Sequence, residues 1–320
     1  MKLLVTGGAG FIGSNFVRSH LASTDDEITV LDALTYAGSR DTLSDFIEDQ
    51  RVSFIEGDIC DREKVELAME GHELVVHFAA ESHVDRSIDG SERFILTNCV
   101  GTNLLCDVAA QMEVERFVHI STDETYGSRM DGSFTESDKL EPSSPYAASK
   151  AASDLIALSH HTTNDLPIII TRSSNNYGPF QFPEKLIPLF VTNLLEGLDV
   201  PLYGDGTNVR DWINVQDNCS AISTVLQKGE IGQIYNIGAG NELSNLDLTK
   251  LLIELCERDE SAITWVDDRP GHDFRYSIDS TKVLDLGWAP QVNLQAGLEA
   301  TVQWYQDNET WWRPKTAKAQ

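Results

Sequence analysis

Residues 3–13 read LLVTGGAGFIG, a short apolar run followed by three glycines spaced three apart. The apolar run predicts a buried strand, and the residues that follow, up to Leu21, predict a helix. Gly7, Gly10 and Gly13 allow a tight turn, a close approach of the backbone to a pyrophosphate and close packing of the helix, whose N-terminus faces the anion. Residues 3–13 therefore predict a strand, a phosphate-binding turn and a helix.

A second predicted strand, residues 28–31, ends in Asp32. Along the sequence, Asp32 follows Gly13 at the separation that is expected of an acid binding a ribose 2′-hydroxyl. No Arg stands next to Asp32 to bind a 2′-phosphate, so the pattern favours NAD over NADP. The alternative is a glycine turn without a ligand.

Further predicted strands alternate with helical runs and cover residues 52–55, 74–78, 117–120 and 168–170. This alternation predicts an α/β fold with a doubly wound parallel sheet. Ligands of such sheets bind beyond the carboxyl ends of the strands. One cleft can therefore collect the polar and small residues that follow these strands, which are Gly7, Asp32, Asp58, Ala79, Ala80, Glu81, Ser82, Thr122, Asp123, Glu124, Ser173, Ser174, Asn175 and Asn176.

The stretch from Ser121 to Gly127 places two carboxylates directly after a predicted strand, and Tyr146 and Lys150 follow about twenty residues later. Alanine-rich surroundings predict a helix, which puts Tyr146 and Lys150 on one face. An ammonium beside a phenol is expected to lower the pKa of the phenol, and Thr122 can complete its hydrogen bonding. The pattern predicts a proton-transfer centre; the alternative is a surface Tyr and a solvated Lys.

After about residue 175, Pro and Gly interrupt the periodicity. This change predicts a domain of residues 1–175 that binds NAD and a smaller one of residues 176–320 that binds the substrate, with some segments of the second packing on the first. Basic residues beside Gly and Pro turns are candidate diphosphate ligands, with surface salt bridges as the alternative. They are Lys185, Arg210, Arg269 and Arg275, with His272 nearby.

The 320 residues carry 51 acidic and 24 basic side chains, which gives a formal charge of −27. Such a balance repels nucleic acids and anionic membranes, and it suggests a hydrated surface suited to high salt. The sequence has no apolar run of membrane-spanning length and passes from Met1 directly into a strand, so we expect a cytoplasmic protein. Five scattered cysteines predict neither a disulfide framework nor a zinc site, and we expect no metal.

The chain resembles the extended short-chain dehydrogenase/reductase superfamily in its Gly-x-x-Gly-x-x-Gly and Tyr-x-x-x-Lys motifs. Within that superfamily it resembles the NAD-dependent nucleotide-sugar 4,6-dehydratases, and the likeness runs over nearly the whole chain. Thr125 departs from the pattern, because the family more often has Val there. Five stretches carry the likeness: DALTYAG (32–38), AAESHVDRS (79–87), STDETYG (121–127), RSSNNYGP (172–179) and DRPGH (268–272).

The resemblance implies a Rossmann sheet with a smaller α/β substrate-binding C-terminal domain, and a tightly bound NAD that is regenerated in each turnover. It also implies a homodimer formed by helices around residues 91–112 and 146–162. The implied activity is a lyase reaction on dTDP-glucose that gives the 4-keto-6-deoxy sugar and water, in deoxysugar biosynthesis of the rhamnose type. The alternatives are a UDP-glucose 4,6-dehydratase and another nucleotide-sugar epimerase or decarboxylase.

By the same resemblance, Tyr146 takes the proton of the glucose 4-hydroxyl with support from Lys150, Glu124 removes the C5 proton, Asp123 protonates the leaving 6-hydroxyl, and Thr122 contacts the 4-hydroxyl. The implied NAD contacts are Gly7, Gly10, Phe11, Ile12, Gly13, Asp32, Leu34, Thr35, Asp58, Ile59, Ala79, Ala80, Thr97, Tyr146, Lys150 and Asn176. The implied substrate contacts are Ser82, Thr122, Asn175, Lys185, Leu186, Pro201, Tyr203, Arg210, Asn241, Arg269 and His272.

Overall fold

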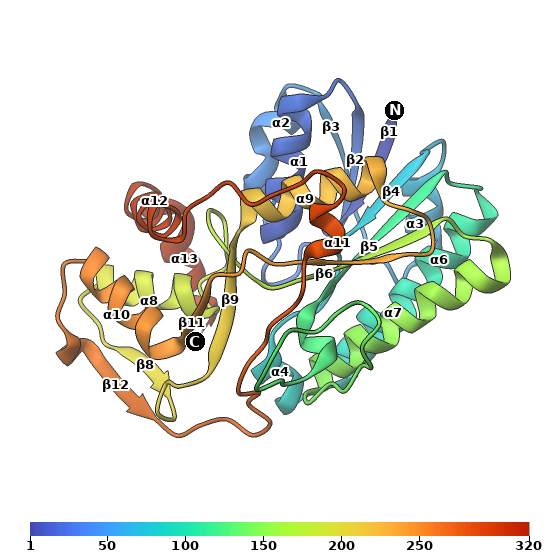
Figure 1. Cartoon of the computed structure of the whole chain (residues 1–320). Helices are drawn as coiled ribbons and strands as arrows, with labels where there is room; N and C mark the ends of the chain where they lie inside the picture. The colour runs from blue at the N-terminus through green and yellow to red at the C-terminus, as the bar shows by residue number, and fades with distance from the viewer. Residues whose placement is uncertain (320) are drawn as a thin grey trace.

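Seven parallel strands form the central sheet of the protein, whose computed structural model describes residues 1–319 and the side chains of residues 1–316. Their order across the sheet is β3-β2-β1-β4-β5-β6-β10 (Figure 1). The strands are β1 (Lys2–Thr6), β2 (Glu27–Asp32), β3 (Val52–Glu56), β4 (Leu74–His77), β5 (Arg116–Thr122), β6 (Ile168–Ser173) and β10 (Ile234–Ile237). Every pairing is parallel, which confirms the predicted doubly wound fold.

Helices cover both faces of this sheet, so its strands are short apolar runs buried on both sides. On one face lie α1 (Phe11–Ser23), α9 (Val215–Lys228) and the short α11 (Thr281–Leu284), and they enclose a core with the strands. On the other face lie α3 (Arg62–Met69), α6 (Thr102–Gln111) and α7 (Pro145–Asn164), with a second core. The strand order reverses between β1 and β4, and a crevice is expected there beyond the carboxyl ends of the strands.

The C-terminal half builds a smaller α/β layer beside that crevice (Figure 1). A three-stranded sheet has the order β11-β9-β7, and a parallel pair joins β12 to β8. Around a third core, which contains Tyr305 and Trp312, these strands pack with four helices. The elements are β7 (Asn175–Tyr177), β8 (Val200–Tyr203), β9 (Val209–Asn214), β11 (Glu242–Ser244), β12 (Ile263–Val266), α8 (Leu186–Leu195), α10 (Asn245–Leu255), α12 (Leu294–Asp307) and α13 (Glu309–Ala319).

Three elements from the C-terminal half return to the first sheet. Strand β10 adds to its edge beside β6, α9 packs against α1 on one face, and α11 packs against β10 on the same face. The remaining segments are short turns of helix between the main elements: η1 (Arg40–Leu43), α2 (Ser44–Glu48), α4 (Val84–Asp89), α5 (Glu92–Phe94), η2 (Ile95–Gly101), η3 (Asp123–Tyr126) and η4 (Glu260–Ala262). The long helix expected around residues 91–112 is thus α5 and α6 joined by η2, which is π-helical.

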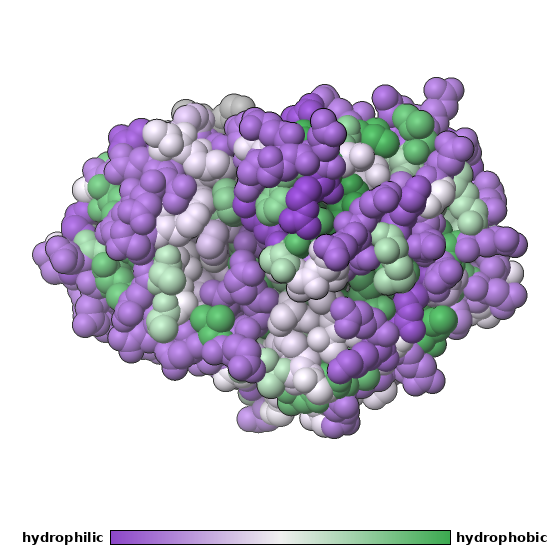
Figure 2. Space-filling view, turned by 90° about the horizontal axis from the view of Figure 1, so that it is seen from above, coloured by the Kyte–Doolittle hydropathy of each residue, from purple (hydrophilic) through white to green (hydrophobic). Residues whose placement is uncertain are grey.

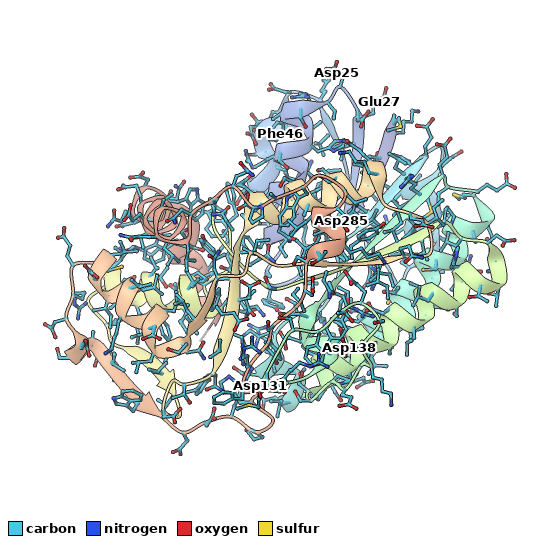
Figure 3. The ribbon with its side chains drawn as sticks, in the orientation of Figure 1. Asp25, Glu27, Phe46, Asp131, Asp138 and Asp285 are labelled. Carbon is cyan, nitrogen blue, oxygen red and sulfur yellow. The ribbon has the colours of Figure 1, made fainter. Side chains whose placement is uncertain are left out.

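The surface is predominantly hydrophilic on the face seen in Figure 2, where hydrophobic residues form small separate patches. Figure 3 labels acidic residues on distant parts of the fold, among them Asp25, Asp131 and Asp285, all of which are exposed. Within the described residues, the structure contains no helix with the length and hydrophobicity that a bilayer crossing requires.

Candidate active site

A cavity of about 360 Å³ opens at the carboxyl ends of the central strands. All five predicted catalytic residues line it, namely Thr122, Asp123, Glu124, Tyr146 and Lys150. Of the residues predicted to contact NAD, the following line it too: Gly7, Gly10, Phe11, Ile12, Gly13, Asp32, Thr35, Asp58, Ile59, Ala79, Ala80, Thr97 and Asn176. Leu34 is not among the lining residues; its backbone N–H donates to Asp32 Oδ1 at 2.8 Å.

The glycine turn after β1 is packed too tightly for side chains. A Cβ on Gly7 would lie 2.5 Å from the backbone nitrogen of Ala79, and φ is +70° there. A Cβ on Gly13 would lie 2.3 Å from the carbonyl oxygen of Gly7. Because α1 begins at Phe11, directly after this turn, its free backbone N–H groups face the cavity, which suits a pyrophosphate.

Asp32 ends β2 at the other side of this turn and is 8% exposed. Its carboxylate accepts hydrogen bonds from the backbone N–H groups of Ala9, at 2.9 Å, and of Leu34. Burial raises the pKa of Asp32, and these two hydrogen bonds oppose that effect. The carboxylate is therefore held in one orientation at the cavity wall, where it can accept hydrogen bonds from a ribose.

Asp123 and Glu124 follow β5 in the short turn η3. Thr122 fixes this turn, because its hydroxyl accepts a hydrogen bond from Glu124 N at 3.3 Å and donates one to Asp123 Oδ1 at 3.2 Å. Burial raises the pKa of Asp123 well above its ordinary value, and the negative charges of Glu124 and Asp211 raise it further. Asp123 is thus the carboxyl that tends to keep its proton.

Glu124 has a different electrostatic environment. Burial raises its pKa as well, but the positive charges of Lys185, Arg269 and Arg210 lower it. The pKa values of the two neighbouring carboxyl groups therefore differ, which makes Asp123 the better proton donor and Glu124 the better base.

Tyr146 and Lys150 extend from the first turns of α7, which begins with Ser144 as N-cap and Pro145 at its first position. Lys150 Nζ donates to the backbone carbonyl of Ile120 at 2.7 Å, and burial lowers the pKa of Lys150 to about 8. Burial, followed by the charge of Glu124, raises the pKa of Tyr146 well above its ordinary value, although a hydrogen bond with Thr122 lowers it.

The expectation that Lys150 lowers the pKa of Tyr146 is wrong for the protein without a bound ligand, in which the pKa of Tyr146 is raised. The ammonium of Lys150 is directed at a backbone carbonyl, and desolvation of the phenol is the larger effect. Phenolate formation at Tyr146 needs a positive charge that the chain does not supply at that point.

The predicted substrate residues divide into two groups. Ser82, Thr122, Asn175, Lys185 and Leu186 line the cavity, and Lys185 Nζ donates to the carbonyl oxygen of Ser82 at 2.5 Å. The others are not among the lining residues: Pro201, Tyr203, Arg210, Asn241, Arg269 and His272.

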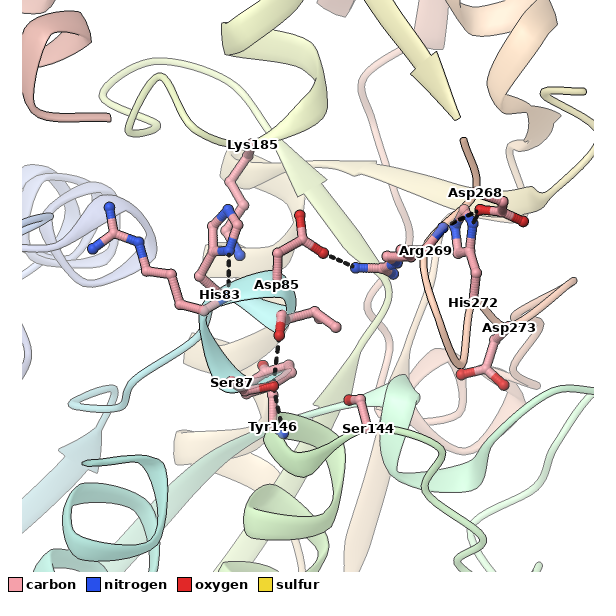
Figure 4. A network of polar contacts seen from close by, with 12 residues as sticks. His83, Asp85, Ser87, Ser144, Tyr146, Lys185, Asp268, Arg269, His272 and Asp273 are labelled. Atoms are coloured by element: carbon pink, nitrogen blue, oxygen red, sulfur yellow. Dashed lines mark hydrogen bonds and ion pairs between the residues drawn. The ribbon is translucent and has the colours of Figure 1, made fainter. Parts of the chain in front are cut away.

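Three of the residues outside the lining are already engaged with protein groups. Arg269 pairs with Asp85 at 2.9 Å, and His272 pairs with Asp268 at 2.6 Å (Figure 4). The guanidinium of Arg210 donates to backbone carbonyls, including that of Asp273 at 2.8 Å. Arg210 therefore anchors the loop that carries Arg269 and His272.

Several cavity residues were not identified from the sequence. They include Arg93, Gln181, Glu184 and Trp212. Ser174, which the sequence predicts in the cleft because it follows a strand, does line the cavity, and its hydroxyl is buried without a hydrogen-bond partner in the structure. Arg93 and Glu184 lie in loops and short helical segments, whose positions follow from tertiary packing.

A doubly wound sheet with a glycine turn, an acid at the end of β2, and a Tyr-x-x-x-Lys pair at the carboxyl edge together define an extended short-chain dehydrogenase/reductase. Among known proteins, the family model described as GDP-mannose 4,6 dehydratase matches residues 4–301. The chain belongs to this family of nucleotide-sugar dehydratases and epimerases.

The relatives match over almost their full length. The chain is 53% identical over 305 residues to the low-salt glycan biosynthesis protein Agl12 of Haloferax volcanii, covering 95% of this chain and 98% of that protein. It is 52% identical over 320 residues to a dTDP-glucose 4,6-dehydratase of Actinoplanes sp., covering 98% and 100%. The structure of DesIV, a dTDP-glucose 4,6-dehydratase from Streptomyces venezuelae with NAD and TYD bound, matches with a TM-score of 0.97, 54% identity and coverage of 98% and 100%.

Proposed function

We propose that this protein is a dTDP-glucose 4,6-dehydratase, which converts dTDP-glucose to dTDP-4-keto-6-deoxyglucose and water. The observation that carries the proposal is the Asp123–Glu124 pair beside Tyr146 and Lys150, in one cavity with a glycine turn that fits a dinucleotide. The high identity to dehydratases of that name over the whole chain supports the same substrate.

NAD fits the first half of the cavity. The glycine turn leaves room for a pyrophosphate, Asp32 offers a carboxylate to a ribose, and Asn176 Oδ1 is buried with no hydrogen-bond partner in the structure. When bound there, NAD supplies a hydride acceptor for C4 of the sugar and later a hydride donor for C6, so that the cofactor is regenerated without net oxidation.

The chain's own residues move the protons. Tyr146, as phenolate, receives the proton of the 4-hydroxyl, and the positively charged nicotinamide of bound NAD would supply the charge that the chain lacks beside the phenol. Lys150, one turn further along α7, would hold the nicotinamide ribose. Glu124 then removes the C5 proton, which oxidation at C4 has made acidic. Asp123 donates a proton to the 6-hydroxyl, which leaves as water, and a proton returns to C5 as the C6 position is reduced. The difference in acidity between Asp123 and Glu124 supports this division of roles.

The Asp123–Glu124 pair also separates this activity from its rivals on the same scaffold. A 4-epimerase or a decarboxylase can use an NAD site and Tyr146, but leaves two adjacent carboxyl groups at the cavity wall without a role. A UDP-glucose dehydratase would use the same chemistry, because uridine and thymidine differ by one methyl group, worth only about 1–3 kcal/mol of discrimination.

The deciding experiment supplies the purified protein with dTDP-glucose and, separately, with UDP-glucose, without added NAD. Alkali then develops the ultraviolet absorbance of the 4-keto-6-deoxy product. Product from dTDP-glucose supports dehydration with a retained cofactor, and the ratio of the two rates reports the nucleotide preference. If neither substrate gives product, even with NAD and salt added, the proposal is contradicted in favour of an epimerase or decarboxylase.

We also propose a homodimer. Exposed apolar side chains gather on two helical segments that pack against each other, η2 and α7: Ile95 (46% exposed), Leu96 (49%), Val100 (50%) and Leu155 (60%). Several exposed apolar side chains on packed helical segments are typical of a protein interface, and pairing the two segments with their copies would make a four-helix bundle.

Three further assignments stay proposals. Residues 1–175 are the part that binds NAD and residues 176–320 the part that binds the substrate. The enzyme acts in the cytoplasm. Its product enters deoxysugar synthesis of the rhamnose type, which is consistent with the chemistry of a 4-keto-6-deoxy nucleotide sugar.

A further inference from the structure

The segment from Ser82 to Ser87, which includes the first four residues of α4, joins three parts of the candidate site (Figure 4). Its Ser82 carbonyl accepts from Lys185, and its Asp85 carboxylate pairs with Arg269. Its Ser87 hydroxyl accepts a hydrogen bond from the backbone N–H of Tyr146 at 3.1 Å. One short segment is thus connected both to the cationic side of the cleft and to the proposed proton acceptor.

The contact between Ser87 and Tyr146 completes the first turn of α7. In that turn the backbone N–H groups have no partners within the helix. Pro145 has no N–H, and Ala147 N donates to the side chain of the N-cap, Ser144, at 3.1 Å. Ala148 N donates to the Ser144 carbonyl at 2.8 Å, which leaves the N–H of Tyr146 to Ser87.

Water cannot replace this contact. Ser87 is completely buried, and Tyr146 is 8% exposed. The proton of the Ser87 hydroxyl is also committed, because Ser87 Oγ donates to the Val84 carbonyl at 2.6 Å. The hydroxyl oxygen is therefore oriented by its own donated hydrogen bond and presents a lone pair to Tyr146 N.

We propose that Ser87 is a positioning residue for catalysis, which fixes the start of α7 so that the phenol oxygen of Tyr146 meets the sugar 4-hydroxyl. This inference rests on the proposed function of Tyr146. Ser87 is not among the residues that line the cavity, and it acts through the backbone of Tyr146. Without its hydroxyl, the buried N–H of Tyr146 lacks an acceptor, and the first turn of α7 shifts or frays. A displacement of about 1 Å at a reacting group can lower a rate by about a hundredfold.

The test compares Ser87→Ala and Ser87→Cys with Ser244→Ala. The Cys variant keeps the buried volume with a much weaker acceptor, so it serves if the Ala variant fails to fold. Ser244 is the N-cap of α10, where its hydroxyl accepts from Asp247 N at 3.0 Å, and it is not among the residues that line the cavity. The control therefore removes a serine hydroxyl that accepts a hydrogen bond from the first turn of another helix.

Both Ser87 variants are expected to lower kcat for dTDP-glucose by about tenfold to a hundredfold, with KM changed by less than about threefold. Amide hydrogen exchange in the first turn of α7, followed in the enzyme without substrate, should become faster in both. Ser244→Ala should leave kcat, KM and exchange in α7 unchanged.

Two outcomes would overturn the inference: full kcat in both Ser87 variants, or a fall in kcat that Ser244→Ala reproduces. Failure of the proposed function is a separate result, because the unaltered enzyme would then make no 4-keto-6-deoxy product at all.

Discussion

Asp123 and Glu124 are neighbours in the chain, yet their side chains lie in different electrostatic environments. Burial and two nearby carboxylates act on Asp123, whereas three cations face Glu124. The sequence indicates the pair and its place after a strand. Only the family resemblance assigns the proton to Asp123; the residue pattern does not, because Lys185, Arg210 and Arg269 reach Glu124 from distant parts of the chain.

Replacing Glu124 by Gln should therefore interrupt the reaction after the first step. We expect product formation to fall by about 10²–10⁴-fold, while substrate still reduces bound NAD, because removal of the C5 proton depends on the carboxylate and oxidation at C4 does not. Stopped-flow absorbance of NADH and the alkali assay measure the two steps. Glu299→Gln, an exposed change on α12, is the matched control. Normal turnover by Glu124→Gln would remove Glu124 from the mechanism.

The buried ammonium of Lys150 predicts a pH limit for the enzyme. Burial lowers the pKa of Lys150 to about 8, against the opposing charge of Asp154, so Lys150 is charged below that pH and neutral above it. We expect kcat/KM to fall above about pH 8. Lys150→Arg, which keeps its charge at high pH, should be slower but should shift this fall to higher pH. An alkaline limb at the same pH in Lys150→Arg would assign it to another group.

Unfolding does not explain such a fall. The folded pKa of Lys150 lies below the value of about 10.4 in an unfolded chain, so between these values the unfolded state binds more protons. The contribution of Lys150 to the free energy of unfolding therefore rises with pH in this range. A melting temperature that holds steady while kcat/KM falls would separate the two effects.

Sequence patterns identify residues better than they identify contacts. The spacing of Tyr146 and Lys150 places them one turn apart on α7, as the structure has them, but the ammonium bonds to Ile120 and not to the phenol. Ser87 lies 59 residues before Tyr146, and no local pattern links the two. Such contacts depend on where α4 and α7 meet, which only the folded chain specifies.

At the scale of elements, η2 and α7 expose apolar side chains where a solvated helix would be polar. Leu155→Glu would place a charge in the proposed interface, so we expect the dimer to dissociate to monomers at micromolar concentration. Leu284→Glu is the control, since Leu284 is 44% exposed on α11, on the opposite face of the sheet. Light scattering with size-exclusion chromatography measures the masses. A dimer that survives Leu155→Glu would place the interface elsewhere.

The elements of the first half were largely predictable, because the strands of a parallel sheet are buried on both faces and therefore consist of continuous apolar runs. The strands of the second half were harder to predict. Strand β7 has three residues, Asn175–Tyr177, and β11 also has three, so their polar side chains give no periodic signal. Strand β10, Ile234–Ile237, has only four residues and is interrupted by the polar Asn236.

The whole molecule carries a charge of −27, and its acidic residues are spread over the surface (Figure 3). Mutual repulsion of these charges opposes the compact state and weakens as salt screens it. We therefore expect the melting temperature to rise by at least about 5 °C between ~0.1 M and ~2 M KCl. Sucrose at equal osmolality favours burial without screening and gives the control. A melting temperature that is constant or falls with KCl would contradict the adaptation to salt.

The place of β10 at the edge of the sheet also orders events during synthesis. A ribosome releases β1 to β6 first, and α9 and β10 follow later. Meanwhile β6, buried along its whole length in the finished protein, has no neighbour on its outer side and presents unpaired N–H and C=O groups. That interval spans about sixty residues, or roughly 3–12 s at typical elongation rates. A nascent chain must therefore carry an open, apolar sheet edge until translation has passed Ile237.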